Sequence, residues 1–379
     1  MKEIPYWIAL SMLPRWKRAR INELIVKFHH DNKTSIEDFF QLDENSWRTI
    51  YGLNAVEITD LKSAKSELGS YAFLAEDLLN QGFEVIPITS QEYSPTLKAN
   101  LKATYSPPVL YVKGNKQLMI ESSLAIVGSR DASEIALQFT DNIAKLASKE
   151  YKVIVSGFAK GVDKQALDSA IKYKGQSIIV LPQGILTFSS GFKNYYRQIV
   201  EGDVLVLSIF FPKTPWKVEL AMARNPIIYG LAKEIYVAES SEKGGTWSGV
   251  VDGLRRNRII YVRNPEQEEK NANNLLIQKG AIPVDFDGKE ASRAYQSLSE
   301  EKSSLVNEPA ESVEIKIGRI FNGTPLTAAE ILKRSNLDWT VRKLSDFLKR
   351  SDKFEVIKKR PLKFKPKGQQ SIAQTTLSL

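Results

Sequence analysis

The spacing of apolar and polar positions changes along the chain. From residue 4 to about 82, apolar residues recur every three or four positions, as in IALSMLPRWKRARINELIVKF, and this period predicts helices. Between Gly82 and Gly114 the period is lost, and FEVIPIT and PPVLYVKGN predict short extended pieces. These pieces belong either to a small subdomain or to the edge of the domain that follows.

From Leu124 to about Asp285, strand-like and helix-like segments alternate. The strand candidates are LAIVG (124–128), KVIVSG (152–157), SIIVLP (177–182), DVLVLSIF (203–210), EIYVAES (234–240) and IIYVR (259–263). Most are continuous apolar runs, which are typical of a parallel sheet covered on both faces. Because amphipathic segments separate them, the pattern predicts an α/β domain with a doubly wound sheet.

The remaining pattern divides the chain into further parts. The predicted parts are a helical domain over 1–82, the α/β domain over 83–285, a polar linker over 286–313, a compact basic domain over 314–367 and a mobile tail over 368–379. The linker and the tail have no apolar period that could build a core.

The basic domain has the signals of two helices and a hairpin. Thr327 and Glu330 have the spacing of a capping box, in which the Thr327 hydroxyl accepts from the Glu330 amide. Asp338 can cap a second helix, whose apolar residues share one face: Val341, Leu344 and Leu348. Alternation in FEVIKKRPLKFK then predicts a two-stranded wing.

Helix, turn, helix and wing together predict a winged-helix-like domain, which can place its second helix in a major groove. The candidates for a second contact with DNA or with a protein partner are Arg342, Lys343, Lys349 and Arg350. The same fold also serves protein contacts, so DNA contact, partner docking and a merely solubilising surface stay open.

The positive charge of the protein is concentrated in this basic domain. The protein has 379 residues and a formal net charge of +9. Residues 316–367 contain 15 Lys or Arg and 5 Asp or Glu, a balance of +10, so the rest sums to about −1. A basic module can bind a polyanion, of which nucleic acid is the commonest.

Composition also disfavours several classes of chemistry. Cysteine is absent, which excludes disulfides, thiolate nucleophiles and cysteine metal sites. The two histidines, His29 and His30, are neighbours and are expected on the surface at a helix end, so a Ser-His-Asp triad and a zinc hydrolase centre have little support. No metal and no cofactor are expected. No apolar run approaches the ~20 residues that cross a bilayer, and we expect a cytoplasmic protein without membrane contact.

Three predicted βα turns carry glycine at the carboxyl edge of the sheet, where such sheets bind ligands. They are GSR (128–130), SGFAKG (156–161) and EKGGTWSG (242–249). Glycine lets the backbone approach an oxyanion, and free amides at a helix start attract it, with Arg130 and Lys160 adding charge. One such turn alone is more often structural, but three at one edge favour a long anionic ligand.

The spacing disfavours nucleotide enzymes of two common kinds. GFAKGV lacks the G-x-G-x-x-G period of a dinucleotide site, and no acidic residue is placed to bind a ribose. No G-K-[ST] follows, so the Walker A loop is also missing. Hydride transfer and NTP hydrolysis therefore lose support.

The chain carries these motifs in order: SPPVLYVKGN (106–115), AIVGSRDAS (125–133), VIVSGFAKGVDKQAL (153–167), IIVLPQGI (178–185), NPIIYGLAKEIYVAES (225–240), GGTW (244–247) and NANNLLIQKGAIP (271–283). In this order they resemble the DprA/Smf family of DNA-processing proteins over about two thirds of the chain. The resemblance implies an extended Rossmann-like fold with an N-terminal helical, SAM-like domain. It further implies single-stranded DNA as the ligand, a homodimer and the loading of a RecA-type recombinase onto incoming strands, with no catalytic residue.

The resemblance also implies which residues bind the phosphates. The family's pocket corresponds to Gly128, Ser129, Arg130, Ser156, Gly157, Phe158, Ala159, Lys160, Gly161, Arg224, Asn225, Gly244, Gly245, Thr246 and Trp247. Two positions differ from the family pattern. Arg224 stands nearly alone, with Pro226 where a second arginine is expected, and fewer cations should weaken phosphate binding. Trp247 can stack on a base or pack under the sheet.

Two alternatives stay open. The core is similar to that of phosphoribohydrolases with the signature PGGxGTxxE, but Glu242 and Lys243 replace the leading Pro-Gly, and only Asp252 follows the threonine. Without the expected glutamate, acid–base catalysis has no agent, so we do not expect an enzyme. The other alternative is a DprA-related regulatory component, such as an antitoxin or phage-defence partner, that binds DNA, a nucleotide or an effector protein.

Overall fold

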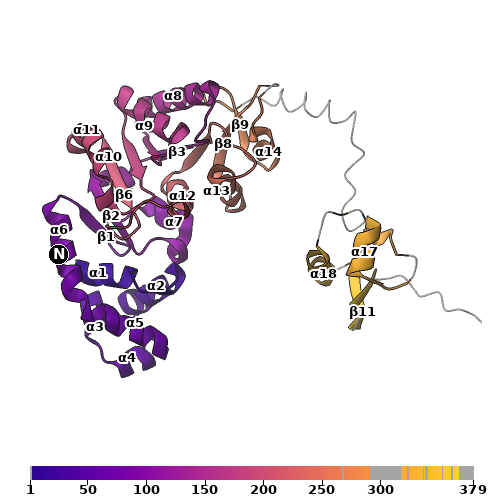
Figure 1. Cartoon of the computed structure of the whole chain (residues 1–379), viewed down its shortest axis with the longest axis horizontal. Helices are drawn as coiled ribbons and strands as arrows, with labels where there is room; N and C mark the ends of the chain where they lie inside the picture. Colours follow the sequence, from indigo (N-terminus) through magenta and orange to yellow (C-terminus); the bar gives the residue numbers. More distant parts are fainter. Residues whose placement is uncertain are drawn as a thin grey trace, which may run out of the picture. The chain divides into compact units, whose positions relative to one another are not determined.

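The computed structural model describes residues 2–266, 269–290, 317–321, 324–335, 337, 340–351, 353–359 and 362–366. Contacts divide the chain into two compact units, Met1–Ala291 and Ser292–Leu379 (Figure 1). The predicted tail and residues 291–313 of the predicted linker lie outside the described residues. The finer division of the first unit at residue 82 stays a prediction, because one hydrophobic cluster runs from its N-terminal helices into its sheet.

The N-terminal part of the first unit is helical, as the apolar period predicts. Its elements are α1 (Ile4–Ser11), α2 (Arg18–Ile25), a π-helix (Val26–Asp31), α3 (Ile36–Gln41), α4 (Glu44–Thr49), α5 (Ala55–Ser66) and α6 (Leu68–Asn80). Buried aromatic rings fill the space between them, with Phe28 stacked on Phe39 at 4.8 Å. His29 and His30 are exposed at the end of a helix, as expected.

A nine-stranded sheet forms the centre of the first unit. Its strands are β1 (Glu84–Pro87), β2 (Val109–Gly114), β3 (Ser123–Val127), β4 (Val153–Ser156), β5 (Ser177–Val180), β6 (Val204–Ser208), β7 (Glu234–Val237), β8 (Ile259–Arg263) and β9 (Ile282–Val284). The order is β1-β2-β6-β5-β4-β3-β7-β8-β9. From β6 to β9 all neighbours are parallel, whereas β1 and β2 form an antiparallel edge.

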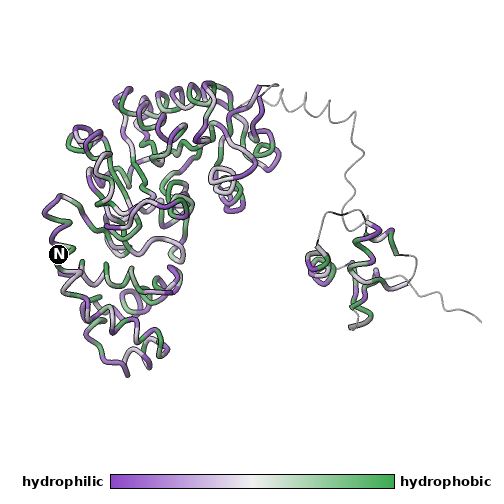
Figure 2. The backbone as a smooth tube through the Cα atoms, in the orientation of Figure 1, coloured by the Kyte–Doolittle hydropathy of each residue, from purple (hydrophilic) through white to green (hydrophobic). Residues whose placement is uncertain are grey.

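The six predicted strands are confirmed, and the two extended pieces before them are the edge of the same sheet. The short strand β9 was not predicted. Figure 2 shows hydrophobic residues gathered along the inner strands, whereas hydrophobic and hydrophilic residues alternate along the helices. This difference arises because the parallel strands are covered on both faces.

Helices connect the strands and cover both faces of the sheet (Figure 1). They are α7 (Pro95–Tyr105), α8 (Glu134–Lys149), α9 (Val162–Lys172), α10 (Ser189–Asn194), α11 (Tyr196–Glu201), α12 (Val218–Leu231), α13 (Gly245–Arg255) and α14 (Asn273–Gln278). Within the described ranges, no helix is both long and apolar enough to cross a membrane.

The order of the parallel strands reverses at the centre of the sheet. The chain starts at β3, adds β4, β5 and β6 on one side, and then returns through α12 to add β7 on the other side of β3. The loops after β3 and β7 therefore diverge and leave a crevice at the carboxyl edge. In doubly wound sheets this switch point is where ligands bind.

The second unit is built from β10 (Leu326–Thr327), α17 (Ala328–Ser335), α18 (Val341–Arg350), β11 (Phe354–Lys359) and β12 (Leu362–Pro366). The strands form an antiparallel sheet in the order β10-β12-β11. The capping box is confirmed, because the Glu330 amide donates to the Thr327 hydroxyl at 3.3 Å and the Glu330 carboxylate accepts from the Thr327 amide at 2.7 Å.

The second helix of this unit differs from expectation at one position. Leu344 and Leu348 are buried, but Val341 is 48% exposed because it is the first residue of α18. Asp338 and the side chains of Lys343 and Arg350 lie outside the described part of the chain. Arg342 and Lys349 are exposed. The winged-helix assignment stays a prediction.

An ion pair between the buried Arg263 and the partly buried Glu269 fixes the edge of the sheet beyond β7. Arg263, at the end of β8, donates to both carboxylate oxygens of Glu269, at 2.7 and 2.5 Å, and to the Ala238 carbonyl at 3.0 Å. The Asn273 amide group also donates to the Ala238 and Arg263 carbonyls and accepts from the Ser240 amide. These bonds hold the loop after β7 against the end of β8 and the start of α14, because Ala238 and Ser240 of that loop bond to Arg263 and Asn273.

We predict that Glu269→Gln destabilises the first unit by about 3 kcal/mol at about pH 7, because it leaves the Arg263 charge buried without a counter-ion. Hydrogen bonds from Arg263 hold the pKa of Glu269 below its usual value of 4.5. The carboxylate therefore stabilises the fold at higher pH, and this contribution is lost as the pH falls below about 4.5. Urea unfolding at about pH 7 and about pH 4 measures both effects. Equal pH dependence in the variant and the parent would contradict the prediction.

Candidate functional site

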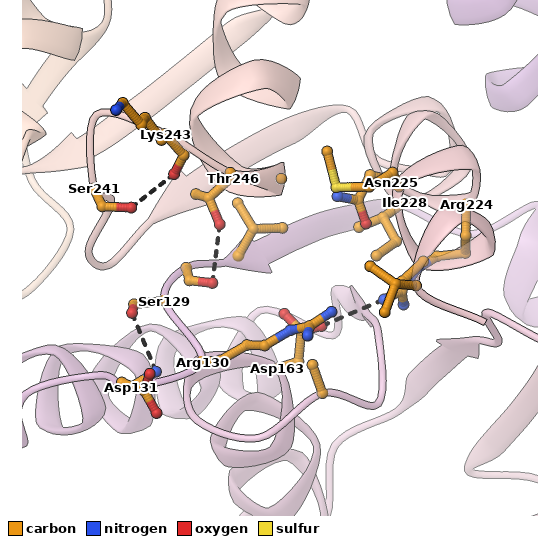
Figure 3. A pocket seen from close by; sticks show the side chains of 18 of the residues that line it. Ser129, Arg130, Asp131, Asp163, Arg224, Asn225, Ile228, Ser241, Lys243 and Thr246 are labelled. Carbon is orange, nitrogen blue, oxygen red and sulfur yellow. Dashed lines mark hydrogen bonds and ion pairs between the residues drawn. The ribbon is translucent and has the colours of Figure 1, made fainter. Parts of the chain in front are cut away.

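A cavity of about 360 Å³ lies at the switch point between β3 and β7 (Figure 3). It is bounded by the loops after β3 and β7, by the start of α9 and by one face of α12. The predicted site residues that line it are Gly128, Ser129, Arg130, Ala159, Arg224, Asn225, Gly244, Gly245 and Thr246. The structure thus brings residues from all three predicted glycine turns, and from the arginine helix, to one cavity.

The start of α13 is the part of the cavity wall best suited to an anion. Its N-cap residue Gly244 has a φ of +102° and supplies no side-chain cap. Among the described residues, no acceptor is recorded for the Gly245 and Thr246 amides. Unpaired amides at a helix start, together with the positive end of the helix dipole, attract negative charge. The Thr246 hydroxyl donates to the Gly128 carbonyl at 2.9 Å and so fixes this turn against the loop after β3.

The helices that follow β3 and β4 start differently. The Ser133 hydroxyl caps α8 by accepting from the Ala136 amide at 3.2 Å. The first amide of α9, that of Val162, donates to the Ser129 carbonyl at 3.2 Å. At least one amide of each of these two helix starts has a partner outside the regular helical bonds, whereas none is recorded for Gly245 or Thr246 among the described residues.

Three cations line the cavity, and they differ in exposure. Arg130 and Lys243 are exposed on the loops after β3 and β7, and Figure 3 shows the Arg130 guanidinium extending toward Asp163. Arg224 is 3% exposed and donates from Nη1 to the Val180 carbonyl at 2.6 Å. Arg130 and Lys243 can therefore meet a ligand from solvent, whereas Arg224 acts from the floor of the cavity.

Arg224 and Asp163 form a buried pair beneath the cavity. The Arg224 Nη2 lies 3.8 Å from an Asp163 carboxylate oxygen, and the Arg224 Nε has no partner among the described residues. Burial raises the pKa of Asp163, and the Arg224 and Arg130 cations oppose this rise. Burial also lowers the pKa of Arg224, yet a guanidinium stays protonated at neutral pH. The pair joins α9 to α12 directly below the loops.

The two glycines of SGFAKG make room for other parts of the protein. A Cβ at Gly157 would lie 2.0 Å from the Arg224 Nη1 and 2.3 Å from an Asp163 oxygen. Gly161 has a φ of +75°, and a Cβ there would lie 2.4 Å from the Ser129 carbonyl oxygen. These glycines therefore allow the buried pair and the close approach of the loop after β3.

Several predicted site residues lie outside the cavity lining. The buried Ser156 hydroxyl donates to the Ile126 carbonyl at 2.8 Å, and Phe158 packs edge-on against Phe188 at 4.8 Å. Lys160 is exposed beside the cavity. Trp247 is half-buried against the hydrophobic core, with the Lys279 ammonium 5.8 Å from its ring. Ligand contact by these residues stays a prediction.

Sequence reasoning missed part of the cavity wall. Lys243 lies beside the glycine pair of EKGG, so a cation flanking that turn was an available signal. The α12 face that carries Met222 and Tyr229 has no such signal. Its place in the wall depends on the return of α12 to the switch point, which is a property of the strand order.

Comparison with known proteins matches this region to one family. The family model "DNA recombination-mediator protein A" matches residues 84–295. A relative from Bacillus subtilis, "DNA processing protein DprA", is 31% identical over 216 residues, which are 54% of this chain and 69% of that protein. A Streptococcus pneumoniae protein with the same name is 34% identical over 164 residues, 43% of this chain and 57% of the relative.

A solved structure shows the same fold. The X-ray structure of DNA processing protein A from Streptococcus pneumoniae aligns with a TM-score of 0.61 and 24% identity. The alignment covers 74% of this chain and 93% of the other. The predicted Rossmann-like architecture of the first unit is therefore confirmed.

We predict that Gly161→Ala destabilises the first unit by about 1–3 kcal/mol, because the side chain meets the Ser129 carbonyl and the residue keeps a left-handed backbone. Gly69→Ala is the matched control, since Gly69 lies in α6 with no atom within 4 Å of an added Cβ. That change should stabilise its helix by up to about 1 kcal/mol. Urea unfolding compares the two variants. A Gly161→Ala protein as stable as the parent would refute the assigned role of this glycine.

Proposed function

We propose, from the premise that this chain belongs to the DNA recombination-mediator protein A family, that it binds single-stranded DNA at the cavity between β3 and β7. One observation carries the proposal: the uncapped start of α13 faces a cavity whose exposed rim carries Arg130 and Lys243. Amides, a helix dipole and two cations together suit a phosphodiester, which has one negative charge and several acceptor oxygens.

The arrangement of loops and cations around the cavity favours a ligand with several phosphates over a single nucleotide. The cavity is walled by loops from three strands, so a ligand can cross several βα turns at one edge. Arg130 and Lys243 lie on loops from different strands. A strand that passes between them would meet a cation on each side, as in other positively charged grooves that follow a backbone.

We further propose that the protein acts by binding and catalyses no reaction. The carboxylates that line the cavity are Asp131 and Asp163, and Asp163 is buried beside Arg224. A general base must reach the proton that it removes. Asp163 lies beneath the loops beside a guanidinium and is badly placed for that work, which leaves the exposed Asp131 as the lining carboxylate that a substrate could reach.

The finer role follows the resemblance to the family. In this proposal the protein works in the cytoplasm as a homodimer, protects incoming single strands and loads a RecA-type recombinase onto them. The exposed Arg342 and Lys349 of the second unit offer a further contact with DNA or with a partner.

One observation favours the regulatory alternative, in which DNA or an effector protein is bound as a signal. Arg224 is buried, so the exposed cations that line the cavity are Arg130 and Lys243. Weaker DNA binding would suit a sensor better than a protein that coats strands. Retention of a RecA-type recombinase by the immobilised chain separates the two roles.

We predict that Arg130→Gln combined with Lys243→Gln weakens binding of an oligothymidylate of about 12 nucleotides. The slope of log affinity against log salt should become shallower by about 1.4, since each phosphate contact on a single strand contributes about 0.7. Fluorescence anisotropy across a salt series measures this slope. Lys33→Gln with Lys149→Gln is the matched control, because both lysines are exposed and neither lines the cavity.

The control pair should bind as the parent does. An unchanged slope in the Arg130 and Lys243 variant would count against DNA contact at this cavity. Hydrolysis of a mononucleotide by the parent protein would instead favour the enzymatic alternative.

A further inference from the structure

A second cationic surface lies at the opposite end of α13. We name it the distal basic hollow, and it is a depression of about 540 Å³. Its lining residues are Ala99, Asn100, Lys102, Lys233, Arg255, Arg256, Asn257, Arg258 and Ile259. These described residues include five cations and no Asp or Glu. The first 315 residues of the chain are close to neutral overall, so this concentration of one sign is local.

Two of the five cations have partners within the fold. Arg258 is half-buried and donates to the Tyr229 and Ala232 carbonyls at 2.8 and 2.5 Å, which holds the end of α12. Arg256 forms an ion pair with Asp252 at 2.7 Å, one turn earlier on α13. These two arginines therefore have structural partners.

The other three cations of the hollow are exposed. Within the described residues, no ion pair is recorded for Lys102, Lys233 or Arg255. A bound anion would offset the mutual repulsion of these three cations.

A continuous path joins the distal basic hollow to the cavity at the switch point. A second cavity of about 170 Å³ lies between them, beside α13. It shares Asn225 and Gly245 with the first cavity, and Asn100 and Arg256 with the hollow. The helix between the two ends has 11 residues, a length of about 16 Å.

The chemistry along this path alternates. Its two ends are cationic, and the intermediate cavity is lined in part by apolar and small residues: Leu101, Met222, Pro226, Tyr229, Gly230, Gly249 and Gly253. A single strand has the same alternation, because charged phosphates are joined to bases and sugars with apolar faces. The match in polarity favours a nucleic-acid strand over an acidic protein segment, which has no need of the apolar middle.

We propose that the distal basic hollow binds backbone phosphates of the same strand whose other phosphate lies at the start of α13. The strand then follows α13 from Gly245 to Arg255, with a base or sugar in the intermediate cavity. This inference rests on the proposed function. It extends the DNA footprint to the amino edge of the sheet, where Lys233 and Arg258 precede β7 and β8.

The test compares two ligands on the full chain carrying Lys233→Gln and Arg255→Gln. Binding of an oligothymidylate of about 12 nucleotides should weaken about tenfold, and its salt slope should become shallower by about 1.4. Binding of a thymidine dinucleotide, which is too short to span α13, should stay unchanged in calorimetry. Both replaced side chains are exposed, so circular dichroism should show an intact fold, and Lys33→Gln with Lys149→Gln is again the control.

Each outcome separates this inference from the function on which it rests. If the variant binds the longer oligonucleotide as tightly as the parent, with the same salt slope, the distal site is refuted and the proposed function stands. If polyglutamate binds the variant more weakly than it binds the parent, while the oligonucleotide binds both equally, the hollow is a protein contact. The inference is then again refuted. If the parent itself binds no oligonucleotide, both proposals fail together.

Discussion

The buried contact between Arg224 and Asp163 is the interaction on which the site depends. Arg224 comes from α12, the helix that returns the chain to the centre of the sheet, and Asp163 comes from the first turn of α9. The same guanidinium also donates to the carbonyl of Val180 at the end of β5. Three elements, α9, α12 and β5, are thereby joined beneath the loops. Removing either charge would leave the other buried without its partner, which is costly in any interior.

This contact determines which of the loops above it stabilise the fold and which can bind a ligand. Gly157 lacks a side chain where Arg224 and Asp163 pass, and Gly161 lacks one where the loop after β3 crosses. The turn that looks most like a phosphate loop in the sequence is therefore largely occupied by the protein's own contacts. The turn after β7 is held by the Thr246 hydroxyl, but no acceptor is recorded among the described residues for its Gly245 and Thr246 amides, which are therefore available to a ligand. Binding and stability are thus assigned to neighbouring turns with similar glycine patterns.

The sequence predicts those features that depend on local pattern. Continuous apolar runs identify six parallel strands, and the spacing of Thr327 and Glu330 identifies a capping box, because both signals arise within a few residues. The glycine turns are also visible, since a positive φ or a close approach demands that residue. Nine of the fifteen site residues that the family resemblance implies line the cavity. Local pattern does not predict which groups a residue contacts. The Val162 amide donates to the Ser129 carbonyl, and Arg224 pairs with the buried Asp163. Both contacts join segments that are distant in the sequence. The distal basic hollow was likewise invisible, since Lys102, Lys233 and Arg255 meet only through the packing of α7, α12 and α13.

A crystal structure of the full chain with an oligothymidylate of about 12 nucleotides tests the central claim most directly. The account predicts a backbone phosphate within hydrogen-bonding distance of the Gly245 and Thr246 amides, with the Arg130 guanidinium on the same or the next phosphate. A strand bound elsewhere on the protein, with no phosphate at the start of α13, would contradict it.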